Sequence, residues 1–129
     1  MLKALKRGKY RVGQRWGYRA RPGEEASLLT IVRVESSPKL GVVVHVSLEG
    51  VRIKSAQAPS GFVDAIAHMP FAESAIDRSV THLVSSDASL PDFEAGYREW
   101  RRAIKAKAGG IFSITVAEGV EFVESTLNG

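Results

Sequence analysis

The sequence contains no cysteine among its 129 residues. Disulfide bonds, thiolate metal sites and cysteine nucleophiles are therefore excluded together. Long apolar runs are also missing, so no segment is predicted to cross a membrane. The basic start of the chain, Met1 to Arg7, is not followed by the apolar segment of a secretory signal. These absences predict a cytoplasmic protein without disulfides and without a membrane partner.

Acidic residues are missing from the first 23 positions, which contain eight lysines and arginines. The rest of the chain holds ten basic and fourteen acidic residues, so the net charge of +4 comes from the N-terminus. Residues 1–11 carry five of those N-terminal charges and are predicted to form a basic flexible tail. The composition, with 44% apolar and 25% charged residues, is that of a folded protein, and we assign residues 12–129 to one domain.

Apolar and polar residues alternate through residues 41–54, as in a half-buried β-strand. One side of this segment would carry Val42, Val44, Val46 and Leu48. Glu49-Gly50 in its middle predicts a two-residue turn, because glycine adopts a positive φ without steric cost. The pattern therefore predicts a β-hairpin over residues 41–54, with His45 on its outer face.

The remaining patterns alternate between strand and helix periods. Strands are predicted over residues 11–21, 27–35, 62–68 and 111–116. Helices are predicted over residues 71–84, from Ser89 to Gly109-Gly110, and after a capping box at Thr115 and Glu118. Together they predict the α+β class: a curved antiparallel sheet, arranged as a partial-barrel-like meander and packed with about three helices from the C-terminal half.

Four arginines share one face of the predicted first strand: Arg11, Arg15, Arg19 and Arg21. Arginine binds phosphate well, because its planar guanidinium is always charged and donates several hydrogen bonds. Trp16 and Tyr18 could stack on bases, so one hypothesis is a protein that binds nucleic acid or another polyanion. The alternative is that these aromatic residues, which point to the opposite face, belong to the core and the arginines are the solvated side of the strand.

Three histidines, His45, His68 and His82, are the candidates for other chemistry. No two of them are three or four residues apart, so the sequence predicts no metal site on a helix. His68 directly precedes Met69-Pro70, at a predicted junction between strand and helix where functional residues often gather. One hypothesis places a ligand on the surface around His45, Arg52 and His68. The alternative is that each histidine only bonds nearby backbone.

No known catalytic or cofactor-binding motif is present, so we expect no cofactor and assign no catalytic residue. Glu118, Glu121 and Glu124 recur on the last predicted helix, where a solvated polar face is sufficient explanation. The sequence therefore favours a non-catalytic binding or protein-interaction module, whose partner is an unknown protein or a small ligand. A hydrolase remains an alternative, in which His68 would act with an acid such as Glu35 or Asp64.

Several longer segments carry a resemblance to a known family. They are Gly13-Gln-Arg-Trp16-x-Tyr18-x-x-Arg21-Pro-Gly-Glu-Glu25, Val44-His45-Val46, His68-Met-Pro-Phe71 with Ala75-x-x-x-Ser79-Val80 after it, and Pro91-Asp-Phe-Glu-x-Gly-Tyr-x-x-Trp100. The chain from residue 12 to its end resembles a family of small uncharacterised bacterial proteins with no assigned activity. The resemblance implies a bacterial single-domain protein and transfers no catalytic residue. Residues 1–11 lie outside it, which weakens the polyanion hypothesis.

Overall fold

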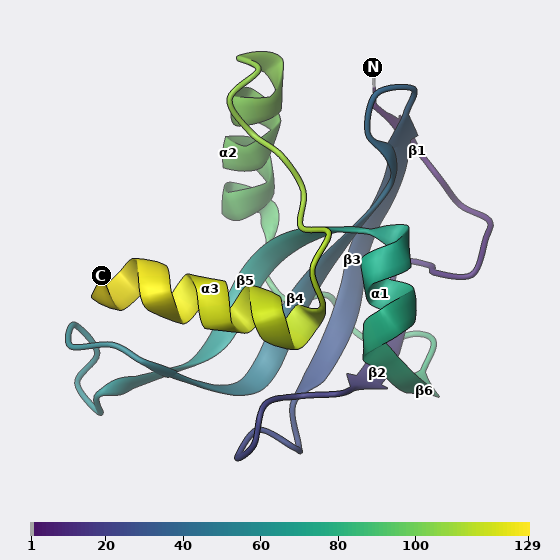
Figure 1. Ribbon diagram of the computed structural model, residues 1–129. Helices are drawn as coiled ribbons and strands as arrows, with labels where there is room; N and C mark the ends of the chain where they lie inside the picture. Colours follow the sequence, from purple (N-terminus) through teal and green to yellow (C-terminus); the bar gives the residue numbers. More distant parts are fainter. Residues whose placement is uncertain (1) are drawn as a thin grey trace.

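The computed structural model describes residues 2–129 and shows an α+β fold (Figure 1). Its strands are β1 (Lys3–Ala4), β2 (Arg15–Tyr18), β3 (Leu28–Ser37), β4 (Gly41–Lys54), β5 (Phe62–Ala72) and β6 (Val80–Ser85). Its helices are α1 (Glu73–Ser79), α2 (Glu94–Lys105) and α3 (Val116–Asn128). The strands form one open antiparallel sheet in the order β5-β4-β3-β2-β6, and β1 pairs with β3. This arrangement confirms the predicted fold class.

Strand β4 lies inside the sheet and is covered on both faces. On one face its apolar residues pack with α1 and α3, which contribute Ile76, Val116 and Val120 to the main core. On the other face Val43 packs with Tyr97 of α2 in a second, smaller cluster. Each of these buried aliphatic side chains contributes about 1.5–3 kcal/mol through removal from water. The middle of β4 therefore has few solvent-facing positions, so its polar residues His45 and Ser47 are also buried.

The predicted hairpin over residues 41–54 is wrong, because β4 continues through Glu49 and Gly50. Gly50 does have a positive φ of +78°, and a Cβ there would lie 3.0 Å from the Cα of Ser27. The glycine serves a bulge, where the register with β5 passes from Glu49–Ala65 to Ile53–Val63. The prediction of an exposed His45 fails for the same reason: β4 has a strand on each side and a helix over this residue, which is fully buried.

The N-terminal residues 2–11, predicted as a flexible tail, contribute to the fold. Lys3 pairs with Ser36 of β3. Tyr10 is only 2% exposed and donates a hydrogen bond of 2.5 Å to Asp77. Met1 lies outside the described residues. The basic side chains of this segment are exposed, but its backbone and its aromatic residue are held by the sheet and α1.

Two other predicted elements differ from the structure. The helix over residues 71–84 is limited to α1, because Pro70 ends up in β5 and residues 80–85 form β6. Proline is tolerated in β5 because this is an edge strand, where a missing N–H removes no ladder bond. Residues 111–116 make only an isolated bridge from Phe112 to Phe71 instead of a strand. The loop over residues 55–61 and the capping box of α3 are confirmed.

A β-bulge in β3 determines which side chains face α2. Ile31 and Arg33 are opposite consecutive residues of β4, so Val32 between them has no partner. Successive residues of a strand point to opposite faces, and one extra residue therefore reverses the alternation. The bulge moves Arg33 and Glu35 onto the face that carries His45. None of the helices in residues 2–129 is long and apolar enough to span a membrane.

Candidate functional site

The structure brings together two of the three residues predicted to surround a ligand. His45 and His68 lie on adjacent strands, with their rings stacked and their centroids 5.0 Å apart. Arg52 is seven residues further along β4, about 20 Å away at the rise of a strand. Its guanidinium stacks on Phe62 at 4.2 Å, and its backbone N–H bonds to Glu24. Arg52 is therefore not part of the histidine cluster.

A chain of hydrogen bonds links three side chains from three neighbouring strands. His68 Nε2 lies 2.8 Å from His45 Nδ1, and His45 Nε2 lies 2.9 Å from Glu35 Oε2. Glu35 and His45 are fully buried, whereas His68 is half-buried. A shift of register in β5, between Met69 and Ile66, lies beside His68 at the outer end of this chain. The hydrolase hypothesis paired His68 with Glu35 or Asp64; the structure connects His68 to Glu35 through His45 and leaves Asp64 exposed.

Helix α2 closes the inner end of the chain. The hydroxyl of Tyr97 donates to Glu35 Oε1 at 2.7 Å, and the Trp100 ring lies against His45 with centroids 4.7 Å apart. The Arg33 guanidinium completes the surroundings of the carboxylate, with Nε 3.0 Å from Glu35 Oε1. That contact is an ion pair without hydrogen-bond alignment, because the buried Nε–H does not point at an acceptor. The Glu35 carboxylate is thus surrounded by donors and cations.

These surroundings fix the charge of each member of the chain. Burial alone would raise the pKa of Glu35, but the contacts with His45, Tyr97 and Arg33 outweigh it and lower that pKa to about 2. Burial lowers the pKa of His45, against the opposing effect of Glu35. Burial and the neighbouring His45 lower the pKa of His68 to about 4. At neutral pH the chain therefore holds one carboxylate and two uncharged imidazoles.

The charge states determine the direction of the hydrogen bonds. An ionised carboxylate only accepts, so His45 donates through Nε2–H to Glu35. The uncharged His45 then accepts at Nδ1, and His68 donates to it through Nε2–H. This leaves the lone pair of His68 on Nδ1, which has no hydrogen-bond partner among residues 2–129 and is not fully buried. The hydrogen-bonded chain can therefore take up a proton at His68, its outer end, and share the added positive charge with Glu35.

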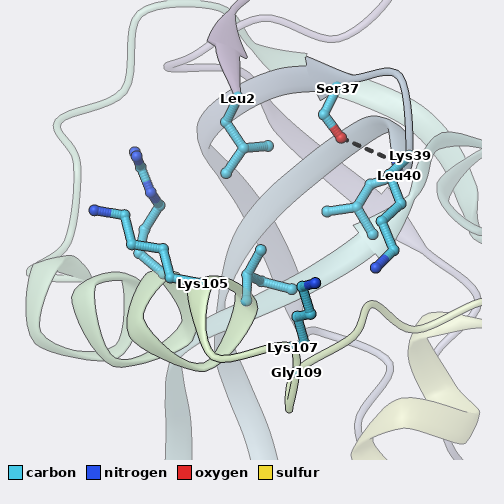
Figure 2. A pocket seen from close by; sticks show the side chains of 9 residues that line it. Leu2, Ser37, Lys39, Leu40, Lys105, Lys107 and Gly109 are labelled. Atoms are coloured by element: carbon cyan, nitrogen blue, oxygen red, sulfur yellow. Dashed lines mark hydrogen bonds between the residues drawn. The ribbon is translucent and has the colours of Figure 1, made fainter.

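A pocket of about 410 Å³ lies beside the C-terminal end of α2 (Figure 2). Its apolar part consists of Leu2, Leu40 and Ile104, and its remaining lining comes from Ser37, Lys39, Arg101, Lys105, Lys107 and Gly109. The turn between β3 and β4 forms one wall, and the end of α2 forms the other. The bond from Leu40 N–H to Ser37 Oγ holds that turn. Within the described residues 2–129, four cations and no carboxylate line the pocket.

Arg101 belongs to both the pocket and the surroundings of the chain. Its Nη1 donates to the hydroxyl of Tyr97 at 3.1 Å and lies 4.0 Å from Glu35 Oε1. The side chain is 36% exposed, so it reaches both solvent and the buried carboxylate. The pocket and the hydrogen-bonded chain therefore share one charged group, the guanidinium of Arg101.

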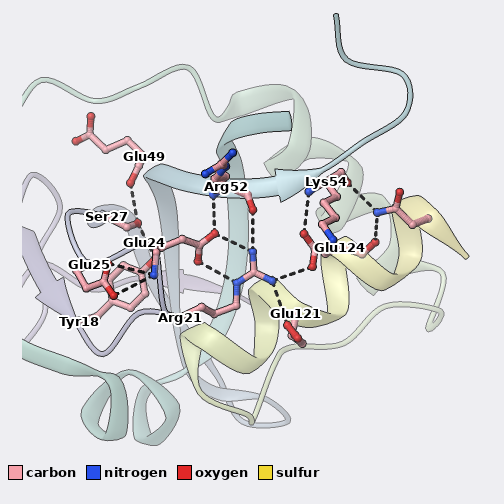
Figure 3. A network of polar contacts seen from close by, with 12 residues as sticks. Tyr18, Arg21, Glu24, Glu25, Ser27, Glu49, Arg52, Lys54, Glu121 and Glu124 are labelled. Atoms are coloured by element: carbon pink, nitrogen blue, oxygen red, sulfur yellow. Dashed lines mark hydrogen bonds and ion pairs between the residues drawn. The ribbon is translucent and has the colours of Figure 1, made fainter. Parts of the chain in front are cut away.

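The four arginines predicted to bind a polyanion lie apart from one another and make different contacts. Arg21 is mostly buried and bonds to Glu24, Glu121 and Glu124 (Figure 3). Arg15 forms an ion pair with Glu49. The other two donate to backbone carbonyls, Arg11 to Gly8 and Arg19 to Arg78. Glu121 and Glu124, predicted as a solvated face, instead hold α3 to Arg21.

Some residues around the pocket and the histidine chain were expected only as core residues, and others were not expected at a site. The helical period placed Tyr97 and Trp100 on the buried face of α2 without suggesting a role beside Glu35. Nothing in the local sequence indicated that Arg101 or Lys107 lines a pocket. The one indication that Glu35 is buried was its own position, as a charged residue within the apolar pattern of β3.

Residues 2–129 contain no group of three histidine, cysteine or acidic side chains placed to hold a metal ion. Comparison with family models, curated proteins and solved structures found no match.

Proposed function

We propose that this protein is a binding module for a small anionic ligand with an apolar body, held in the pocket beside α2. The observation that carries the proposal is the lining, which among residues 2–129 combines apolar side chains with four cations and no acid. A volume of about 410 Å³ is within the range of small-molecule sites. Such a site would remove the apolar body from water and pair the anionic group with lysine and arginine.

The position of the charges supports a single anionic group at one end of the ligand. Lys39 lies on the turn after β3, and Lys105 and Lys107 lie at the end of α2, so the cations come from two separate walls (Figure 2). Leu40 and Ile104 lie between these walls and belong to the second apolar cluster. An alkyl chain on these leucine and isoleucine side chains would leave its head group within reach of the lysines.

Calorimetry with octanesulfonate tests this proposal, because the sulfonate stays ionised and the alkyl chain is apolar. Reversing the charge of Lys39 and Lys107 together, to glutamate, is expected to weaken binding by about tenfold or more, as each lost ion pair is worth up to about 1 kcal/mol. Lys6→Glu is the matched control, because Lys6 is exposed and does not line the pocket. Equal affinities of all variants, or no binding by the unaltered protein, would contradict the proposal.

A second candidate function is hydrolysis with His68 as general base. It is favoured by the chain of hydrogen bonds from Glu35 through His45, which leaves the lone pair of His68 on a partly exposed Nδ1. His68 Nδ1 would take a proton from water as that water attacks an ester carbonyl. It would pass the proton to the alcohol oxygen as the acyl C–O bond breaks, which gives a carboxylic acid and an alcohol. The chain would share the positive charge during this step.

The test is hydrolysis of para-nitrophenyl acetate, followed by absorbance. General-base catalysis at His68 is expected to raise the rate about a hundredfold above hydrolysis in buffer alone and to disappear in His68→Gln. His82→Gln is the control, since His82 lies on β6 and bonds only to Thr81. A rate no higher than that of buffer alone would remove this candidate.

A further inference from the structure

We infer that ligand binding in the pocket is coupled to proton uptake by the chain Glu35–His45–His68, with Arg101 as the group that both share. The inference rests on the proposed function, since it concerns the regulation of the same pocket. It adds a second site, the histidine chain, to the binding equilibrium. The expected consequence is that the pocket binds its anion more tightly at lower pH.

Arg101 lies between two regions that can compete for its charge, the Glu35 cluster and the pocket. On the inner side its guanidinium donates to Tyr97 Oη, and that hydroxyl donates to Glu35 Oε1. On the outer side it lines the pocket together with the lysines. Because its contact with Glu35 is long, at 4.0 Å, the guanidinium is attracted to the carboxylate without a direct hydrogen bond. An anion in the pocket therefore competes for this cation.

The sign of the coupling follows from charge. An anion beside Arg101 offsets part of the positive potential that this residue supplies to the inner cluster. Less positive potential at Glu35 and His45 makes an extra proton on the imidazoles more favourable. Binding of the anion thus promotes protonation, and by reciprocity protonation promotes binding of the anion. The proton would enter at His68 Nδ1, which has no partner among residues 2–129.

The other charged groups that face the chain do not titrate at mildly acidic pH. Strand β3 contributes Arg33 and Glu35, and α2 contributes Tyr97 and Arg101. The pKa of Glu35 is about 2, and burial together with the contact to Glu35 raises the pKa of Tyr97 above its ordinary value. His45 on β4 and His68 on β5 are the two remaining members. A pH dependence of binding with a sulfonate would therefore report on the histidines.

The test is calorimetry with octanesulfonate at about pH 7.5 and about pH 5.5, in pairs of buffers with different heats of ionisation. We expect binding about fivefold tighter at the lower pH, with net proton uptake revealed by the difference between buffers. His68→Gln and Tyr97→Phe are each expected to reduce this ratio toward one. His82→Gln should keep it, since that histidine does not belong to the chain.

A measurement on the unaltered protein guards against variants that fold poorly. The ring signals of His45 and His68, followed by NMR through a pH titration, should shift their midpoint upward when octanesulfonate is present. Binding of octanesulfonate that is independent of pH, or midpoints that do not move, would overturn the coupling and leave the proposed function intact. An absence of binding at both pH values would overturn the proposed function and the coupling with it.

Discussion

Replacing Arg21 by methionine is expected to lower the free energy of unfolding by about 3–5 kcal/mol, the usual cost of removing one partner from a buried ion pair. Arg21 is 16% exposed, and its guanidinium contacts three carboxylates and the carbonyl of Arg52 (Figure 3). Of the carboxylates, Glu24 is 2% exposed in its side chain and depends on Arg21 most directly. Methionine would keep most of the apolar contact and remove the charge.

The expected loss of stability arises mainly at Glu24. Its two oxygens receive bonds from Arg21 Nε and Nη2 at 2.9 and 2.8 Å, and a further bond from the backbone of Arg52. Burial would raise the pKa of Glu24, but these bonds lower it below its ordinary value. Without the guanidinium, a buried carboxylate would keep only its backbone donor. The segment before β3 would also lose its connection to α3 through Glu124.

Urea unfolding, followed by circular dichroism, measures this effect. Arg19→Met is the matched control, because Arg19 is exposed and its guanidinium donates to one carbonyl, that of Arg78. We expect a change of less than about 1 kcal/mol for that control. Equal losses in the two variants would show that the Arg21 contacts contribute no more to stability than an ordinary surface arginine.

Replacing Glu35 by alanine is expected to cost a similar amount, about 3–5 kcal/mol. The substitution would leave His45 Nε2–H and the Tyr97 hydroxyl without their acceptor, and Arg33 without its counter-charge. Each buried donor that loses its partner costs about 1–3 kcal/mol. Glu25→Ala is the control, because Glu25 is exposed and its carboxylate accepts from the backbone N–H of Gly23 rather than from a buried side chain. If Glu35→Ala unfolds at the same urea concentration as this control, the buried chain adds nothing to stability.

The hydrogen-bonded chain Glu35–His45–His68 also affects how the free energy of unfolding responds to acid. His68 has a pKa of about 4 in the folded protein and 6.5 as an ordinary histidine, so the unfolded chain binds the extra proton first. Stability is therefore expected to fall as the pH decreases from 6.5 to 4, by no more than about 3 kcal/mol from this residue. Glu35 acts in the same direction at lower pH, since its pKa of about 2 lies below the ordinary value of 4.5. His68→Gln should flatten the upper part of that dependence.

The fold class could be predicted because it depends on periodicity, which survives in most elements. The face of α2 with Tyr97 and Trp100 follows the helical period, and the cap of α3 depends on residues three positions apart. The expected hairpin failed because a glycine with positive φ serves a bulge as well as a turn, and Gly50 serves a bulge. The choice between them depends on whether a strand is available on each side of β4.

The candidate site could be predicted only in fragments. His45 and His68 were both candidates, but their contact depends on the register of β4 and β5, which no local pattern reveals. The connection to Glu35 depends on a bulge in β3, and the pocket on the end of α2 meeting a turn 60 or more residues earlier in the chain. The arginines formed the clearest pattern in the sequence, yet Arg21 is used within the fold.

The bulge at Val32 implies that the register between β3 and β4 decides which face of the sheet carries Glu35. Replacing Val32 by another β-branched residue would preserve the count of residues between Ile31 and Arg33. Regular pairing of β3 with β4 beyond Ile31 would instead bring Val32 opposite His45 and Glu35 opposite Val42, and would turn Glu35 toward the core beneath α1 and α3. The one unpaired residue of β3 therefore keeps the Glu35 carboxylate on the side of the sheet that carries His45.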